Sequence, residues 1–133
     1  MASFPYNHLK APDREDTMKI TGLDKIEKVK MTMEGAKDVL KQVPLSKNDG
    51  APNFSFRVFT ILPGGHTPYH THSVEHMNYI IEGEGMVVDE AGGERPVKKG
   101  EFVLVLPDEK HQYKNASAKD PMVMICAVPK EYE

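Results

Sequence analysis

Short apolar segments, of which residues 53–62 alternate with polar positions, recur along most of the chain after residue 52. Alternation with a period of two places one set of side chains on each face of a β-strand. The strands predicted in this way cover residues 53–62, 77–82, 86–89, 95–97, 102–106, 111–115 and 122–128. Glycine or proline separates them at intervals of about ten residues, which is typical of an antiparallel sandwich or barrel. The sequence therefore predicts an all-β domain.

The first fifty residues follow a different pattern. Residues 1–25 are polar, contain scattered prolines and show no period, so we expect an N-terminal arm that precedes one domain over residues 26–133. Residues 26–33 and 39–43 have the character of strands interrupted by Gly35, and a short helix over residues 35–42 is the competing interpretation. We expect residues 44–52 to form a loop and Pro63-Gly64-Gly65 to end the strand before it.

Composition excludes several classes of protein. The 133 residues include 17 Lys+Arg and 20 Asp+Glu, and the net charge of −3 gives no broad basic surface for nucleic acid or anionic lipid. No apolar run approaches the ~20 residues of a membrane span. Cys126 is the only cysteine, so an intramolecular disulfide is excluded and a cytoplasmic location is expected.

Histidines are the candidate chemistry of this chain. Side chains at positions i and i+2 of an extended segment share a face, so His70 and His72 should point the same way. His76 should point to the same face as His70 and His72 if strand pairing is regular across residues 73–75. Neutral imidazoles that converge on one face suit a divalent metal, whereas a solvated histidine-rich loop is the alternative interpretation. His66 follows a glycine turn and His8 lies in the arm, so neither is expected to be a ligand.

The spacing of these residues resembles the two motifs of the cupin superfamily. The first motif is matched by Gly64, His70, His72, His76 and Gly83, with His76 where the superfamily usually has glutamate. The second motif is matched, with small shifts in spacing, by Gly100, Pro107, His111 and Asn115. The resemblance implies a cupin-type double-stranded β-helix, or jelly-roll barrel, with an N-terminal extension.

A closer resemblance is to small single-domain cupins with four histidine ligands. It rests on the segments 49–54 (DGAPNF) and 126–131 (CAVPKE), and on the His70, His72, Glu75, His76 pattern. It implies a metal site formed by His70, His72, His76 and His111. Glu75 is an alternative ligand, but the six residues between His76 and Gly83 favour His76 and leave Glu75 facing outward. Ser73-Val74 departs from the Pro-Trp that relatives often carry.

Four neutral ligands leave the charge of a divalent ion uncompensated, so such a site should attract anionic oxygen donors. An octahedral ion would keep two positions for water, substrate or dioxygen. Nitrogen ligation suits Mn, Fe, Co, Ni, Cu or Zn, and the resemblance to oxygen-using cupins implies manganese or iron.

Three residues are candidates for contact with a substrate. Strand parity places Tyr113 on the same face as His111, and Tyr113 is the best candidate for a hydroxyl that faces the substrate. Arg57 is a candidate clamp for a carboxylate, with an arginine on an exposed face or in an interface ion pair as the alternatives. Cys126 is a candidate pocket wall or a small buried hydrophobe, and the resemblance favours the Met124/Cys126 face as the interior.

These features favour a metal-dependent oxidoreductase of dioxygenase type that acts on a small oxygenated or aromatic molecule. The alternatives are a non-redox isomerase or lyase acting on a sugar acid or similar carbonyl compound, and a non-catalytic protein that binds a metal or small ligand. Small cupins of this kind pair through N-terminal strands, so the resemblance also implies a homodimer in which residues 26–43 add to the partner's sheet.

Overall fold

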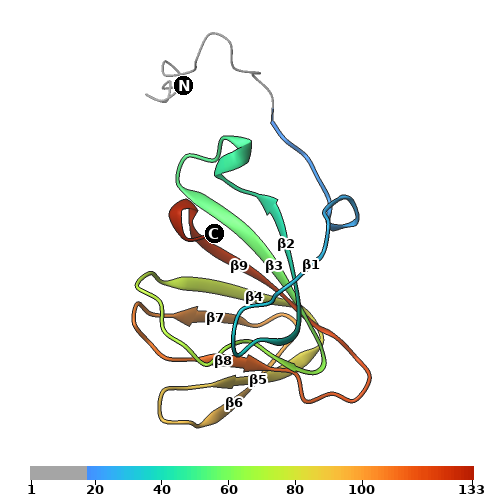
Figure 1. Ribbon diagram of the computed structural model, residues 1–133, viewed down its shortest axis with the longest axis vertical. Helices are drawn as coiled ribbons and strands as arrows, with labels where there is room; N and C mark the ends of the chain where they lie inside the picture. Colours follow the sequence, from blue (N-terminus) through green and yellow to red (C-terminus); the bar gives the residue numbers. More distant parts are fainter. Residues whose placement is uncertain (1–17) are drawn as a thin grey trace.

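The computed structural model describes residues 18–133 as one curled antiparallel β-sheet (Figure 1). The all-β prediction is confirmed, and the described part of the chain contains three single 3-10 turns but no α-helix. Residues 1–17, which make up most of the predicted arm, lie outside the described residues. The strands are β1 (Val29–Lys30), β2 (Lys37–Leu45), β3 (Phe54–His66), β4 (His76–Glu82), β5 (Glu84–Val88), β6 (Glu94–Lys98), β7 (Phe102–Val105), β8 (Gln112–Lys114) and β9 (Met122–Pro129).

The strand order is β6-β5-β8-β3-β9-β4-β7, and β2 pairs with β3 as an additional branch that also carries β1. Figure 1 shows β2, β3, β9 and β4 in one curved layer, with β8, β5 and β6 below it. The thirteen-residue β3 joins the layers, because it pairs with β9 over most of its length and with β8 at His66. No helix between residues 18 and 133 is long and apolar enough to cross a membrane.

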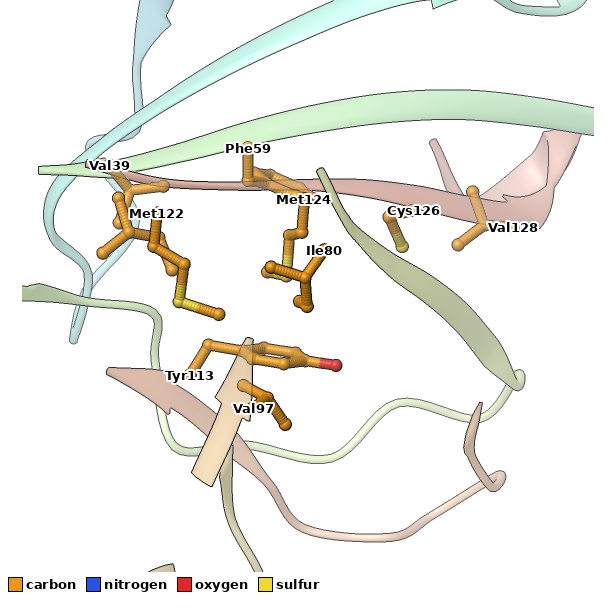
Figure 2. Close-up of a cluster of buried hydrophobic side chains, with 10 residues drawn as sticks. Val39, Phe59, Ile80, Val97, Tyr113, Met122, Met124, Cys126 and Val128 are labelled. Atoms are coloured by element: carbon orange, nitrogen blue, oxygen red, sulfur yellow. The ribbon is translucent and has the colours of Figure 1, made fainter. Parts of the chain in front are cut away.

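The interior between the two layers is filled by apolar side chains. Met122, Met124 and Cys126 extend from β9 toward Tyr113 and Val97, which come from the opposite layer (Figure 2). All five are at most 9% exposed. The Met124/Cys126 face of the last strand is therefore the interior face.

Two boundaries differ from the sequence prediction. The helix considered over residues 35–42 is wrong, because residues 37–45 form β2 and pair with β3 from Lys37↔His66 to Leu45↔Phe56. The expected loop begins later than residue 44, with a 3-10 turn over Lys47–Asp49 that is capped by the Ser46 side chain. Tertiary pairing therefore overrides the weak local preference of this segment.

β3 does not stop at Pro63-Gly64-Gly65 as expected, but continues to His66. Gly64 has a φ of 77°, and a Cβ on Gly65 would lie 2.6 Å from the Lys37 carbonyl oxygen. The register between β2 and β3 shifts between Lys37 and Val39 at this place. The two glycines thus form an irregular stretch that bends the strand without ending it, which carries the chain directly into the histidine segment.

The segment before β2 lies against the sheet of its own chain. The Gln42 amide donates hydrogen bonds to the carbonyl oxygens of Leu23 and Ile26, at 2.8 and 2.9 Å. β2 is paired with β3 of the same chain along one edge, and its other edge carries only the two-residue β1, so the addition of residues 26–43 to a partner's sheet stays a prediction.

Candidate metal centre

Four histidines gather in one pocket between the layers. His70 and His72 lie in the segment after β3, His76 begins β4, and His111 comes directly before β8. His70 and His111 form an antiparallel bridge, with backbone N–O distances of 3.2 and 3.1 Å. This bridge brings together the two halves of the site, which are about forty residues apart in the chain.

The rings lie within contact distance of one another. The His72 ring centroid is 5.4 Å from that of His70, 4.7 Å from that of His111 and 3.5 Å from that of His76. The surrounding cavity has a volume of about 80 Å³. Its lining consists of Met31, Met33, Arg57, Phe59, Thr67, Pro68, His70, His72, His76, Asn78, His111, Tyr113, Met124, Cys126 and Tyr132.

Backbone carbonyls orient three of the four imidazoles. The Nδ1 atoms of His70, His72 and His111 lie 2.9, 2.8 and 2.9 Å from the carbonyl oxygens of Pro68, Val74 and Glu109. A carbonyl only accepts, so each Nδ1 carries the hydrogen and donates it. Each neutral ring therefore keeps its lone pair on Nε2, which is the usual arrangement of a metal-binding histidine.

Two of these lone pairs face each other. The Nε2 atoms of His72 and His111 are 3.3 Å apart, and neither carries a hydrogen to share. Two imidazole ligands at about 2.1 Å from one ion and at right angles would place their nitrogens about 3 Å apart. A cation that both atoms contact removes the repulsion between their lone pairs.

His76 has a different environment. Its ring stacks on that of His72 with an angle of 10° between the planes, and its Nδ1 lies 3.3 Å from Arg57 Nη2. Arginine only donates, so this Nδ1 accepts. His76 Nε2 is buried without a hydrogen-bond partner, and Arg57 Nε is the other side-chain atom of this kind among residues 18–133. Both unpaired atoms belong to residues that line the histidine pocket.

Burial keeps these rings neutral. It lowers the pKa of His72 and His111 below the ordinary value. It also lowers the pKa of His76 to about 2, with a further contribution from the Arg57 charge. The charged imidazolium is disfavoured because the pocket withholds water from it. His72 and His111 are thus available as ligands at neutral pH without first losing a proton.

The predicted substrate-contact residues all lie in this pocket. Arg57 is 8% exposed and donates to Cys126 Sγ at 3.2 Å, so the alternative of an arginine on an exposed face is wrong. Cys126 is 1% exposed, and its Sγ is 3.6 Å from His76 Nδ1. The Tyr113 hydroxyl donates to Asn78 Oδ1 at 2.8 Å, and burial raises the pKa of this phenol.

Tyr132 is a pocket residue that sequence reasoning did not find. Its ring lies edge-on to His76 and His72, with centroid distances of 4.8 and 5.3 Å. Glu133 holds this last turn, since its side chain accepts from the Ser55 hydroxyl and its carbonyl oxygen accepts from Lys41 Nζ. Nothing in the sequence marks a tyrosine beyond the last strand as a neighbour of the histidines.

The remaining candidates lie outside the pocket lining or outside the described residues. Glu75 is exposed while His76 is buried, so the carboxylate does not face the pocket. His66 is half-buried beside Thr67 and Gln112, outside the pocket lining. His8 lies outside the described residues. Asn115 is buried and donates to the carbonyl oxygens of Ile61 and Asp120, which makes it a structural residue of the barrel.

Comparison with protein families gives one match, to the cupin domain, over residues 57–128. The matched region contains β3 from Arg57 onward, all four pocket histidines and nearly all of β9. The chain belongs to the cupin family. The predicted jelly-roll barrel is thereby confirmed, and the curled sheet of Figure 1 is a cupin barrel.

Solved cupin-like structures resemble this chain over most of its length. The polyketide cyclase RemF from Streptomyces resistomycificus is 25% identical, with a TM-score of 0.80 over 85% of this chain and 80% of that chain. A cupin 2 conserved barrel domain protein from Rhodopseudomonas palustris is also 25% identical, with a TM-score of 0.65 over 78% and 70%. Ectoine synthase from P. lautus is 24% identical, with a TM-score of 0.70 over 85% and 78%, and shares the fold. Comparison with curated proteins finds no match.

The donor set of this cupin fits a divalent transition metal. Three oriented Nε2 lone pairs are what such an ion would contact, whereas His76 Nε2 carries the hydrogen of its neutral ring while Nδ1 accepts from Arg57. Within residues 18–133, three donors do not yet surround a common point as the rings lie. A fourth bond from His76 requires its ring to turn away from His72, on which it stacks, and its hydrogen to move from Nε2 to Nδ1.

Proposed function

We propose that this cupin holds a divalent transition metal through His70, His72, His76 and His111, and that it is an oxidoreductase of dioxygenase type. Its substrate would be a small oxygenated or aromatic molecule. The observation that carries the proposal is the set of three imidazoles whose Nδ1 atoms are each bound to a carbonyl, so that their Nε2 lone pairs are left for an ion.

Manganese and iron are the proposed metals. A bound ion of this kind supplies Lewis acidity and electron transfer to dioxygen. The four imidazoles are neutral, and no Asp or Glu lines the pocket among residues 18–133. Nothing on the protein side therefore lowers the positive charge of the ion, and anionic oxygen donors are the expected ligands.

The pocket favours oxidation over proton-transfer chemistry. An isomerase or lyase needs a general base close to the substrate. No Asp, Glu or Lys lines the described pocket, and the Tyr113 phenol has a raised pKa and already donates to Asn78. Oxidation at the metal needs no such base. The side chains of Phe59 and Met124 give this pocket an apolar wall that limits access of water.

The similarity to a polyketide cyclase supports a second candidate. This candidate is a non-redox enzyme in which the ion would polarise a carbonyl group without taking up dioxygen. Isomerisation or cleavage of a sugar acid would use the same chemistry. The same pocket residues would then orient the substrate for bond formation. Oxygen consumption separates the two candidates.

The test measures metal content and dioxygen uptake together. Protein prepared with manganese or iron should retain close to one ion per chain by mass spectrometry. His111→Ala should lose most of it, because one of the oriented ligands is removed. His66→Ala is the matched control, since His66 is a half-buried histidine outside the pocket, and it should retain the ion.

Metal-loaded protein is then given catechols, diketones and uronates in an oxygen electrode. Uptake of dioxygen that depends on one substrate and is absent in His111→Ala is the expected result. Substrate conversion in the absence of dioxygen would favour the non-redox candidate. Metal retention without conversion of any substrate would favour a binding protein, and equal metal retention by His111→Ala and the parent would overturn the proposed site.

A further inference from the structure

Arg57 is a buried charge inside the histidine pocket. It is 8% exposed and lies on β3, with its guanidinium carbon 4.9 Å from the Phe59 ring centroid and 5.4 Å from that of Tyr132. The two rings hold the planar group by contact with its faces. The position of the charge is thus fixed by packing.

No oxygen anion in the described residues compensates this charge. Among residues 18–133, Arg57 forms no ion pair and no hydrogen bond to a carbonyl or carboxylate oxygen. Its Nη2 contacts a sulfur and an imidazole nitrogen, Cys126 Sγ and His76 Nδ1, and its Nε has no partner. A buried arginine normally has a carboxylate partner, because removing a charge from water is costly.

Arg57 borders the space where a ligand would lie. Arg57 and the four histidines line the same cavity. A guanidinium offers its donors in a planar fork that matches the two oxygens of a carboxylate. A carboxylate in this cavity would satisfy Arg57 Nε and neutralise a charge that the protein leaves uncompensated.

We propose that Arg57 binds a carboxylate group of the substrate. The pocket would then select small molecules that carry a carboxylate in addition to oxygen donors for the ion. This inference rests on the proposed function, and it names the substrate class of that site. Arg57 contributes affinity and selectivity for the carboxylate, and the histidines contribute the binding of the ion.

The experiment compares ligands that differ only in charge. Catechol, 3,4-dihydroxybenzoate and 2,3-dihydroxybenzoate, and the methyl esters of the two acids, are titrated calorimetrically into the metal-loaded protein. At least one acid should bind about tenfold or more tightly than its ester and than catechol, which corresponds to a charge-assisted pair in a desolvated site. The two isomers are used because they place the carboxylate at different positions relative to the chelating oxygens.

Variants of Arg57 and Arg95 test whether Arg57 causes the preference for the acid. Arg57→Gln keeps a donor for His76 Nδ1 but removes the charge, and should reduce the affinity for the acid about tenfold while changing that for catechol less than about threefold. Arg57→Lys should retain part of the preference. Arg95→Gln is the control, because Arg95 is largely exposed and paired with Asp89, and it should behave as the parent.

The experiment distinguishes a failure of the proposed function from a failure of this inference. If the parent protein retains no ion, the proposed function fails, and if the loaded parent binds neither acid, this inference fails. If catechol binds but neither acid is preferred over its ester, Arg57 is not a carboxylate site, and this comparison needs no variant to fold. If Arg57→Gln retains metal and keeps the full preference, the carboxylate is bound elsewhere and the inference is overturned.

Discussion

The tautomers of the pocket histidines are set by contacts two residues away. His70 and His111 donate to the carbonyl of the residue two positions earlier, and His72 to that of the residue two positions later. These local hydrogen bonds form when the loop folds. The Nε2 lone pairs of His70, His72 and His111 are therefore oriented before an ion binds. A site built in this way loses little entropy on binding, because the rings are already oriented.

We expect the metal-free protein to lose stability between pH 7.5 and 5.5. An unfolded histidine has a pKa of about 6.5, whereas burial lowers the pKa values of His72, His76 and His111 in the folded state. Below pH 6.5 the unfolded chain therefore binds more protons than the folded chain. The free energy of unfolding consequently falls as the pH is lowered. The loss is about 1 kcal/mol for each histidine that stays neutral.

Urea unfolding of chelator-treated protein at the two pH values measures this loss. His76→Gln removes the group with the lowest pKa and should reduce the loss by about 1 kcal/mol. A stability that is equal at pH 7.5 and 5.5 would contradict the buried, neutral state of these rings.

At the residue scale, parity grouped His70 with His72, while the resemblance to the cupin motifs added His111 and favoured His76 over Glu75. Residues 71–75 are irregular and not a strand, yet Glu75 is exposed and His76 is buried, as the motif spacing predicts. Two features were beyond prediction. Tyr132 reaches the pocket through the path of the last turn, and the stacking of His76 on His72 depends on packing against Arg57 and Cys126.

At the scale of elements, glycines determine where strands cross closely. A Cβ on Gly83, between β4 and β5, would lie 2.2 Å from the Pro121 carbonyl oxygen, in the segment that enters β9. Gly83 also has a φ of 79°. The turn thus needs glycine for both its conformation and its close approach to the backbone. Gly100 has a φ of 94° but would meet no atom within 4 Å.

Replacing these two glycines by alanine separates the two effects. Gly100→Ala should cost about 1–2 kcal/mol of the free energy of unfolding, which is the cost of a left-handed residue with a side chain. Gly83→Ala should cost more than about 3 kcal/mol, because the backbone at Pro121 must also move. Urea unfolding at pH 7.5 measures both, and equal costs would show that the contact with Pro121 is unimportant.

The strand pattern was predictable at this scale, but the end of β3 was not. Short apolar segments bounded by glycine or proline indicated each strand from β3 to β9 within a few residues. Pro63-Gly64-Gly65 has the composition of a turn, yet pairing continues past it to Lys37↔His66. The glycines and proline indicate only that the backbone is free to turn here. Whether the strand ends or continues depends on pairing with the neighbouring strand.

At the scale of the molecule, one face of the sheet is apolar and partly exposed. Leu104, Met77, Ala127 and Phe56 form a row across β7, β4, β9 and β3, as the strand registers require. Leu104, Met77 and Phe56 are 57%, 55% and 44% exposed. An apolar row of this kind, which we call the outer face, is typical of an interface between proteins.

We propose that a second copy of the chain covers the outer face, so that the protein is a homodimer. This face is the proposed interface because its apolar side chains Leu104, Met77 and Phe56 are exposed in one row. Light scattering at micromolar concentration should give twice the 14.9 kDa of the chain. Leu104→Glu should give a monomer with unchanged metal content, because it places a charge in the interface and not in the pocket.

Lys99→Glu is the control, since Lys99 is exposed in the turn between β6 and β7, away from this row. It changes the net charge in the same direction and should remain a dimer. A monomeric parent protein would contradict the proposal, and a dimeric Leu104→Glu would place the interface on another surface.

The central place of β9 has a consequence for synthesis on the ribosome. β9 lies between β3 and β4, yet its residues are translated after those of every other strand. Phe54 at the start of β3 pairs with Pro129, so this edge stays open while the intervening chain is made. Open strand edges pair readily with other chains. The newly made polypeptide is therefore most prone to aggregate just before residues 122–129 emerge, and a chaperone that shields the edges of β3 and β4 would act at that moment.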